Sequence, residues 1–261
     1  MASHRPTSTY RTIFISDLHL GTKEARAGAA LEFIVRHQCD YLYLVGDIID
    51  GWSLRRSWYW PSSHNAVIQE LLEIAAGATE VRYIPGNHDD VARDFLDLHL
   101  GGILIEGQSV HRTADGRELA VIHGDEFDGV LRSAKWLSML GAISYAGLLK
   151  LNRLVNHVRS WLGLPYWSFS SFLKYKTKRA VQYIGDFEDL VSEKARREEV
   201  DGIVCGHIHH PELTRMGDIL YANTGDWVES CTALVEHHDG TLELLRSPRD
   251  RHQPTPGAAH L

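Results

Sequence analysis

Short apolar runs alternate with amphipathic segments in the first third of the chain. The runs Thr12–Ile15, Tyr41–Val45 and Val81–Ile84 are β-branched, aromatic or aliphatic along most of their length. Between them, Ala25–His37 and Asn65–Ala76 repeat apolar residues at helical spacing. Continuous apolar strands separated by helices indicate a parallel sheet that is covered on both faces. The pattern therefore predicts a β-α-β-α-β unit and an α/β fold.

The pattern changes beyond residue 100. Shorter runs are separated by turns such as Asp115-Gly116 and Asp239-Gly240, which favour hairpins. We expect the runs to be strands of a second, more antiparallel sheet. The expected strands are Ile103–Ile105, Ser109–Arg112, Glu118–Ile122, Gly202–Cys205, Glu212–Arg215, Ile219–Ala222, Thr232–Glu236 and Thr241–Leu245.

One segment differs from the rest in charge. The chain has a formal net charge of −7, yet residues 130–185 contain nine Lys or Arg and no Asp or Glu. Apolar and aromatic residues are interleaved with these basic ones, and a charged helix is expected at Phe187–Arg197. We therefore predict a helical insert, 127–197, within a core of residues 1–126 and 198–247. The Pro-, Gly- and Ala-rich tail, 248–261, is predicted to be disordered.

Cysteine spacing and hydropathy exclude several classes of protein. The three cysteines, Cys39, Cys205 and Cys231, include no C-x-x-C pair, so neither a disulfide framework nor a thiolate zinc site is predicted. No apolar run approaches the ~20 residues that span a bilayer, and the N-terminal residues lack the apolar stretch of a signal peptide. We expect a cytoplasmic protein that can still lie on a membrane surface.

Five predicted strands are followed by clusters of Asp, Asn and His. The carboxyl ends of parallel strands meet at one edge of a sheet, where ligands bind. Carboxylates and imidazoles without thiolates suit Mn, Fe or Zn. A single strand-end Asp is as often a turn residue or a helix cap, so the combination carries the prediction. The motifs are Asp17-Leu18-His19, Gly46-Asp47-Ile48-Ile49-Asp50, Gly86-Asn87-His88-Asp89, His123-Gly124-Asp125 and Gly206-His207-Ile208-His209.

These motifs, in this order, resemble those of the calcineurin-like metallophosphoesterases. The resemblance extends from Ile13 to about Val235 and implies a two-sheet sandwich with a helical lid. It also implies two divalent metal ions. Mn²⁺ is the expected metal, and Fe and Zn are the alternatives. The implied ligands are Asp17, His19, Asp47 and His209 for one ion, and Asp47 again with Asn87, His123 and His207 for the other.

The same resemblance implies roles for two further residues. His88 would face the substrate phosphate and act in catalysis, and Asp50 would orient His88. Fold and metals do not choose among the many phosphate esters that such sites hydrolyse. The choice of substrate therefore depends on the insert and on the loops around the metals.

The order of core, insert and the closing motif Asn223–Trp227 resembles the bacterial UDP-2,3-diacylglucosamine pyrophosphatases. That resemblance implies hydrolysis of a lipid-linked nucleotide sugar to lipid X and UMP in lipid A synthesis. It also implies a peripheral location at the inner face of the cytoplasmic membrane, with no nucleic-acid partner. This family commonly has Arg after the metal-binding Asn, whereas this chain has His88. A sister group that acts on a related phosphodiester is therefore an alternative.

Two basic clusters are candidates for binding the substrate or an anionic membrane. One lies in Trp52–Trp60, interpreted as a loop after the second motif, and the other lies in the insert. The alternatives are a packed surface loop and an insert that only covers the core. A soluble phosphodiesterase or nuclease acting on a nucleotide or cyclic nucleotide is the alternative function. The candidate residues are Arg55, Arg56, Lys174, Lys176 and Lys178.

Overall fold

A computed structural model describes residues 8–129 and 170–247, with side chains from 183 onward in the second range. The chain divides into two compact units, Met1–Asp125 with Val191–Leu261, and Glu126–Leu190. Most of the predicted insert and the predicted tail lie outside the described residues, so their boundaries stay predictions. Within the described residues, no helix is long and apolar enough to cross a membrane.

Seven strands of the described chain form the first sheet. The three central strands are parallel to one another, which confirms the predicted β-α-β-α-β unit. The strands in spatial order are β12 (Leu242–Arg246), β11 (Thr232–Glu236), β1 (Ser8–Ile15), β2 (His37–Val45), β3 (Glu80–Ile84), β5 (Ile103–Ile105) and β4 (His99–Leu100).

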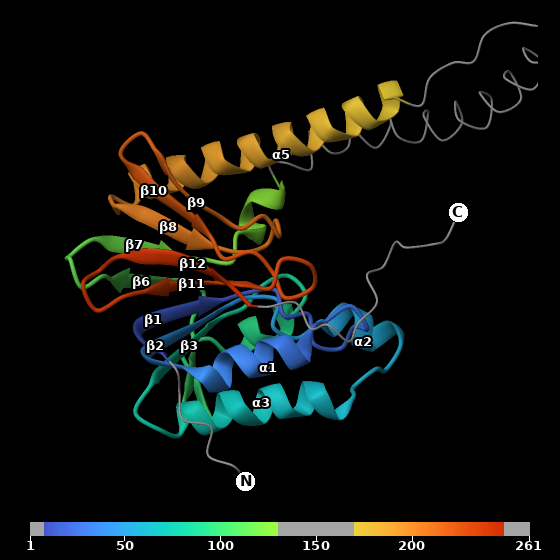
Figure 1. Ribbon diagram of the computed structural model, residues 1–261, viewed down its shortest axis with the longest axis vertical. Coiled ribbons are helices and arrows are strands. Elements are labelled where there is room, and N and C mark those ends of the chain that lie inside the picture. Colours follow the sequence, from blue (N-terminus) through green and yellow to red (C-terminus); the bar gives the residue numbers. More distant parts are fainter. Residues whose placement is uncertain (1–7, 130–169, 248–261) are drawn as a thin grey trace, which may run out of the picture. The chain divides into compact units, whose positions relative to one another are not determined.

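Alternate residues of β1 pack on opposite faces of this sheet. Ile13 and Ile15 join the cluster formed with helices α1 (Ala27–Arg36) and α3 (Ser62–Ala75), which lie side by side on one face (Figure 1). Phe14, between them, packs on the other face with residues of the second sheet. Burying a side chain of this size contributes about 2 kcal/mol. Both faces of the central strands are therefore core, as their continuous apolar sequences predict.

Five strands of the described chain form the second sheet, and the sheets pack face to face through the cluster that contains Phe14. Two pairings of the second sheet are parallel and two are antiparallel. The first sheet has the same equal proportion, so the expectation that the second sheet is more antiparallel than the first is wrong. β5, β11 and β12 were also expected here but pair within the first sheet. The second sheet runs β6 (Ser109–Arg112), β7 (Glu118–Val121), β8 (Gly202–Cys205), β10 (Ile219–Asn223) and β9 (Glu212–Met216).

Strand β11, which the sequence pattern assigned to the wrong sheet, shows why strand pairing was not predictable. All five of its residues are buried, so its sequence has no alternation that would assign it to one sheet. It pairs antiparallel with β1, where Ile13 lies opposite Val235. This choice depends on residues more than 200 positions apart, which a local pattern does not specify.

The remaining helices also depart from the sequence pattern. The expected loop Trp52–Trp60 begins inside a short helix, α2 (Gly51–Arg56), because Asp50 caps it by accepting a hydrogen bond from Ser53 N at 2.6 Å. The charged helix α5 is a single element, Ser170–Arg197, far longer than predicted. In the second unit, the rings of Phe127 and Phe187 meet edge to face at 5.6 Å. Short 3₁₀ helices span Asp90–Phe95 (η1) and Asp125–Phe127 (η2).

Candidate metal centre

The loops that follow β1 and β2 run side by side at the carboxyl edge of the first sheet. The amide of Asp17 donates to Gly46 O at 3.0 Å, and the amide of His19 donates to Asp47 O at 2.9 Å. Each loop therefore fixes the backbone of the other. As a result, the first two motifs present their carboxylates and imidazole at one place.

Left-handed backbone conformations concentrate at this edge. The described chain contains eight non-glycine residues with positive φ, and five of them belong to the implied ligand set. Such conformations are disfavoured for residues with a side chain and persist where the surroundings enforce them, often at functional sites. The five are Asp17, His19, Asp47, His207 and His209, with φ of 54°, 48°, 53°, 69° and 53°.

The glycines of the motifs allow the backbone to pass directly against these side chains. A Cβ atom at Gly46 would overlap the imidazole of His123, and one at Gly86 would overlap the carboxylate of Asp47. Gly46 also has a φ of 78°. Glycine is required at these two positions because any larger residue would displace a candidate ligand.

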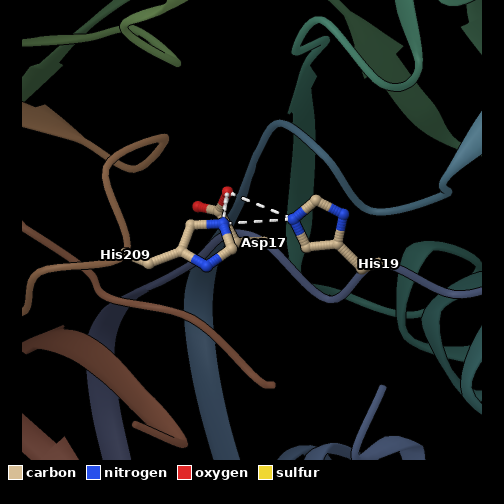
Figure 2. Close-up of side chains that lie close together, drawn as sticks. All are labelled: Asp17, His19 and His209. Atoms are coloured by element: carbon tan, nitrogen blue, oxygen red, sulfur yellow. Dashed lines mark hydrogen bonds and ion pairs between the residues drawn. The ribbon is translucent and has the colours of Figure 1, made fainter. Parts of the chain in front are cut away.

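The first cluster combines Asp17, His19 and His209 (Figure 2). Asp17 Oδ1 lies 3.1 Å from His209 Nε2 and 3.7 Å from His19 Nε2. The two Nε2 atoms are 3.2 Å apart. The other oxygen of Asp17, Oδ2, accepts a hydrogen bond from His207 N at 3.0 Å. One carboxylate oxygen of Asp17 thus accepts a backbone hydrogen bond, while the other points at the two imidazoles.

The two oxygens of the Asp47 carboxylate also have different partners, and this carboxylate connects the first cluster to a second. Its Oδ1 accepts a hydrogen bond from His88 N at 2.8 Å. Its Oδ2 lies 3.4 Å from His123 Nε2 and 3.8 Å from His19 Nε2. Ligand atoms of Asp47, His123 and His207 all lie within 4.8 Å of one another. The carboxylate of Asp47 therefore faces both clusters, as expected for a bridging ligand.

Two buried atoms show that these residues fit a metal ion. Asn87 Oδ1 and His123 Nε2 are buried without a hydrogen-bond partner, an arrangement that costs free energy unless another group satisfies the atom. His123 Nδ1 lies 2.9 Å from Val45 O, which fixes the ring so that Nε2 faces Asp47. A cation would satisfy both orphaned atoms.

Electrostatics at the cluster also favour added positive charge. Burial raises the pKa of Asp17, but the imidazoles of His19 and His209 outweigh it and hold that pKa well below its usual value. Burial lowers the pKa of His19 and His123, but the neighbouring carboxylates raise these pKa values to about 10 and about 9. The carboxylates thus attract cations strongly, and divalent ions would replace the imidazole protons.

His88 and Asp50 contact each other beside the candidate metal ligands. Asp50 Oδ2 lies 3.0 Å from His88 Nδ1 and 3.3 Å from His19 Nδ1. Burial raises the pKa of Asp50, but hydrogen bonding to both imidazoles lowers it overall. His88 Nε2 points toward the cluster, 4.0 Å from Asp47 Oδ2. Asp50 therefore contacts a candidate ligand as well as the candidate catalytic histidine.

Asp89 is a supporting residue whose role is not evident from the sequence. It is buried, and its Oδ1 accepts a hydrogen bond from Gly86 N at 2.6 Å while Oδ2 accepts one from Ile48 N at 2.7 Å. Asp89 thus ties the Asn87-His88 loop to the Asp47 loop. Its place at the end of the third motif was the available signal.

The closing motif Asn223–Trp227 forms the support beneath Asp17. Asn223 Nδ2 donates to Gly206 O at 2.7 Å, and Trp227 N donates to Asp17 O at 3.0 Å. Thr224 Oγ1 lies 2.6 Å from Ser16 Oγ. The motif therefore acts through the backbone of ligand-bearing loops, a role that its sequence alone did not indicate.

The structure describes the side chains of only two of the candidate substrate-binding residues. Arg55 and Arg56 are exposed on α2, which begins directly after Asp50. Within the described part of the chain, neither forms an ion pair. Their assignment stays a prediction, as does that of three lysines on α5 whose side chains lie outside the described residues, namely Lys174, Lys176 and Lys178.

Comparison with known proteins identifies the family. The family model for calcineurin-like phosphoesterases matches residues 10–211. The chain therefore belongs to the calcineurin-like phosphoesterase family, and it is a hydrolase of phosphoester or pyrophosphate bonds. The family implies divalent metal ions, and the two clusters have ligands that suit them.

Several relatives share a single name. A UDP-2,3-diacylglucosamine hydrolase of Porphyromonas gingivalis is 29% identical, over 91% of this chain and 97% of its own length. The enzyme of the same name from Klebsiella pneumoniae is also 29% identical, over 91% and 99%. A phosphoesterase structure from E. coli is 15% identical, with a TM-score of 0.41 over 91% of this chain and 99% of that one.

Proposed function

We propose that this protein hydrolyses the pyrophosphate bond of UDP-2,3-diacylglucosamine, or of a closely related lipid-linked nucleotide sugar, with two Mn²⁺ ions. The observation that carries this proposal is the carboxylate of Asp47, which faces both His/Asp clusters. Relatives named for this substrate align over nearly the full length of the chain. The products would be a diacylglucosamine 1-phosphate and UMP.

The residues present divide into two ligand sets. When bound, the two ions would lower the pKa of a water and balance charge on the phosphoryl oxygens. Nitrogen and oxygen donors of this kind suit Mn²⁺, while Fe and Zn are the alternatives to be tested. One set comprises Asp17, His19, Asp47 and His209, and the other comprises Asp47, Asn87, His123 and His207.

In the proposed reaction, His88 is the side chain that donates a proton or a hydrogen bond to the substrate. Asp50 Oδ2 at 3.0 Å favours a proton on Nδ1 of His88 and leaves Nε2 directed toward the cluster. From there, protonated Nε2 would donate to a phosphoryl oxygen or to the leaving oxygen. Asp50 is itself fixed, because its second oxygen accepts from Ser53 N. The start of α2 thus fixes the carboxylate that contacts Nδ1 of His88.

We further propose a peripheral cytoplasmic location on the inner face of the membrane. The support is the segment 130–185, which carries nine basic residues and no acidic ones, a composition suited to anionic lipid. Replacing Lys174, Lys176 and Lys178 together with Ala would weaken binding to phosphatidylglycerol vesicles, and the loss would shrink as salt rises. Equal sedimentation of this variant and wild type at low salt would contradict the role of these lysines.

A substrate panel tests the proposed reaction. Initial rates with Mn²⁺ would be compared for UDP-2,3-diacylglucosamine, its deacylated form, cyclic AMP, a phosphopeptide and bis-p-nitrophenyl phosphate. The proposal predicts the highest kcat/KM for the acylated nucleotide sugar. Equal rates for the acylated and deacylated forms would contradict a lipid-linked substrate. A preference for cyclic AMP would instead favour a soluble phosphodiesterase.

A further inference from the structure

The indole of Trp52 packs against the imidazole of His88 in a tilted arrangement. The ring centroids are 4.2 Å apart and the planes are inclined by 33°. On another side, the ring of His19 meets the same imidazole edge to face at 4.8 Å and 89°. The His88 ring is therefore packed between Trp52 and a candidate metal ligand. Trp52 itself is 47% exposed, so it is not a core residue that happens to lie near the site.

The backbone connects Trp52 to His88 as well. Gly51 N donates to His88 O at 2.9 Å, and a Cβ at Gly51 would approach that oxygen to 2.8 Å. The first turn of α2 thus rests directly on the His88 peptide. Leu54, on the inner side of the helix, lies against Gly21. Trp52 consequently has a defined position above His88.

Asp50 alone does not define the orientation of the His88 ring. Its Oδ2 lies 3.0 Å from His88 Nδ1 but is shared with His19 Nδ1 at 3.3 Å. A single contact at Nδ1 fixes one atom and leaves the ring free to tilt about it. The indole restricts that tilt, because with ring centroids only 4.2 Å apart a rotation of the imidazole toward the indole would make the two rings overlap.

We propose that Trp52 is a positioning residue, which holds the imidazole plane of His88 so that Nε2 points at the reacting phosphoryl group. This inference rests on the proposed function only in assigning Nε2 of His88 to that group. Misplacing a catalytic group by about 1 Å can cost about 100-fold in rate. Trp52→Ala is therefore expected to lower kcat about 10- to 100-fold with little change in KM or metal content.

The first test uses bis-p-nitrophenyl phosphate with Mn²⁺, which needs neither a nucleotide nor an acyl chain. Trp52→Ala would lose kcat, and Trp52→Phe would recover most of it because a phenyl ring can still stack. Trp58→Ala is the matched control, since Trp58 is 77% exposed and its ring meets that of Trp60 at 6.5 Å. Trp58→Ala should match wild type. Trp52→Leu replaces the Ala variant if that variant does not fold.

A double-mutant cycle decides whether Trp52 acts through His88. If it does, Trp52→Ala should change kcat by less than about 3-fold in a His88→Ala background, because coupled residues are not additive. An equal loss in both backgrounds would overturn the proposal, as would a rise in KM with unchanged kcat, which would indicate direct contact with substrate. A wild-type rate in His88→Ala would overturn it too.

The same data separate this proposal from the proposed substrate. If the cycle behaves as expected on bis-p-nitrophenyl phosphate while UDP-2,3-diacylglucosamine is not cleaved, the positioning role stands and the substrate assignment fails. If UDP-2,3-diacylglucosamine is cleaved but the cycle is additive, the substrate stands and the positioning role fails.

Discussion

Asp50 Oδ2 lies 3.0 Å from Nδ1 of His88. The same oxygen lies 3.3 Å from Nδ1 of His19, whose Nε2 faces Asp17 and Asp47. One carboxylate therefore contacts both the imidazole that we propose faces the substrate phosphate and the imidazole of a candidate metal ligand. A carboxylate that contacts the second ring nitrogen of a metal-binding histidine orients that ligand and raises its basicity.

This shared contact gives a prediction for Asp50→Asn. The variant keeps the shape of the side chain but loses the charge that both imidazoles face. Metal affinity is expected to fall about 10- to 100-fold, the usual cost of losing such a partner, and kcat should fall even when metal is saturating. Metal titration and steady-state kinetics check the two effects. A loss of kcat with unchanged metal affinity would show that His19 does not depend on Asp50.

Asp47 and Asn87 should differ in how many ions depend on them. Asp47 faces both clusters, so Asp47→Ala should lose both metal ions and all measurable activity. Asn87 belongs to one ligand set, and Asn87→Ala should retain about one equivalent of metal. Elemental analysis of the purified variants measures this directly. Two equivalents of metal in Asp47→Ala, with full activity, would contradict the assigned centre.

His88 should matter for rate and not for metal content. Its ligand atom lies within 4.8 Å of those of His19 and Asp47, but neither proposed ligand set includes it, so His88→Ala should keep both ions. Its rate should fall about 10²–10⁴-fold, the range for loss of a general acid or a charge stabiliser. Metal analysis and kcat are measured on the same preparation. An unchanged rate would make His88 structural, and loss of metal would make it a ligand.

The local sequence was enough to predict the central strands and to single out the candidate ligands that the structure brings together. Each ligand-bearing motif follows a strand whose apolar run is continuous, and parallel strands bring their carboxyl ends together. The left-handed backbone at Asp17 and Asp47 was not predictable from residue type. It is imposed by hydrogen bonds between two loops about 30 residues apart.

Contacts that depend on the assembled fold were also not predictable. The packing of Trp52 against His88 needs α2, and α2 depends on the cap by Asp50, a second contact of Asp50 that its motif did not indicate. Likewise, Asn223 supports Gly206 through a backbone carbonyl, and such a contact leaves no pattern in the sequence. The residues that take part in the chemistry are therefore easier to identify from the sequence than the residues that hold them in place.

A pH prediction comes from a buried network away from the metal centre. Glu236 is fully buried and accepts hydrogen bonds from Arg11, Thr12 and Ala114 N, with His111 Nε2 at 2.8 Å. Burial raises the pKa of Glu236, but His111, Thr12 and the amide outweigh it and lower the pKa to about 2. The stabilisation is thus present above pH 4.5, the usual value, and is lost as the pH falls toward 2.

Glu236→Gln tests this network. At pH 7 it should lower the free energy of unfolding by about 3 kcal/mol, the cost of removing one partner of a buried charge pair. The difference from wild type should narrow below pH 4.5, because the Glu236 carboxyl of the unfolded wild-type chain becomes protonated there while that of the folded protein stays charged until the pH approaches 2. Urea unfolding at pH 7 and pH 3, with EDTA in both, measures the two values. The same difference at both pH values would contradict the account of Glu236.

We propose that a two-metal site in this chain cleaves a lipid-linked nucleotide sugar. The most direct measurement is UMP release from UDP-2,3-diacylglucosamine by protein stripped of metal with EDTA and then supplied with Mn²⁺. The account predicts no release before Mn²⁺ is added, release of equal amounts of UMP and diacylglucosamine 1-phosphate afterwards, and none from Asp47→Ala. Absence of UMP release by Mn²⁺-loaded wild type that still hydrolyses bis-p-nitrophenyl phosphate would contradict it.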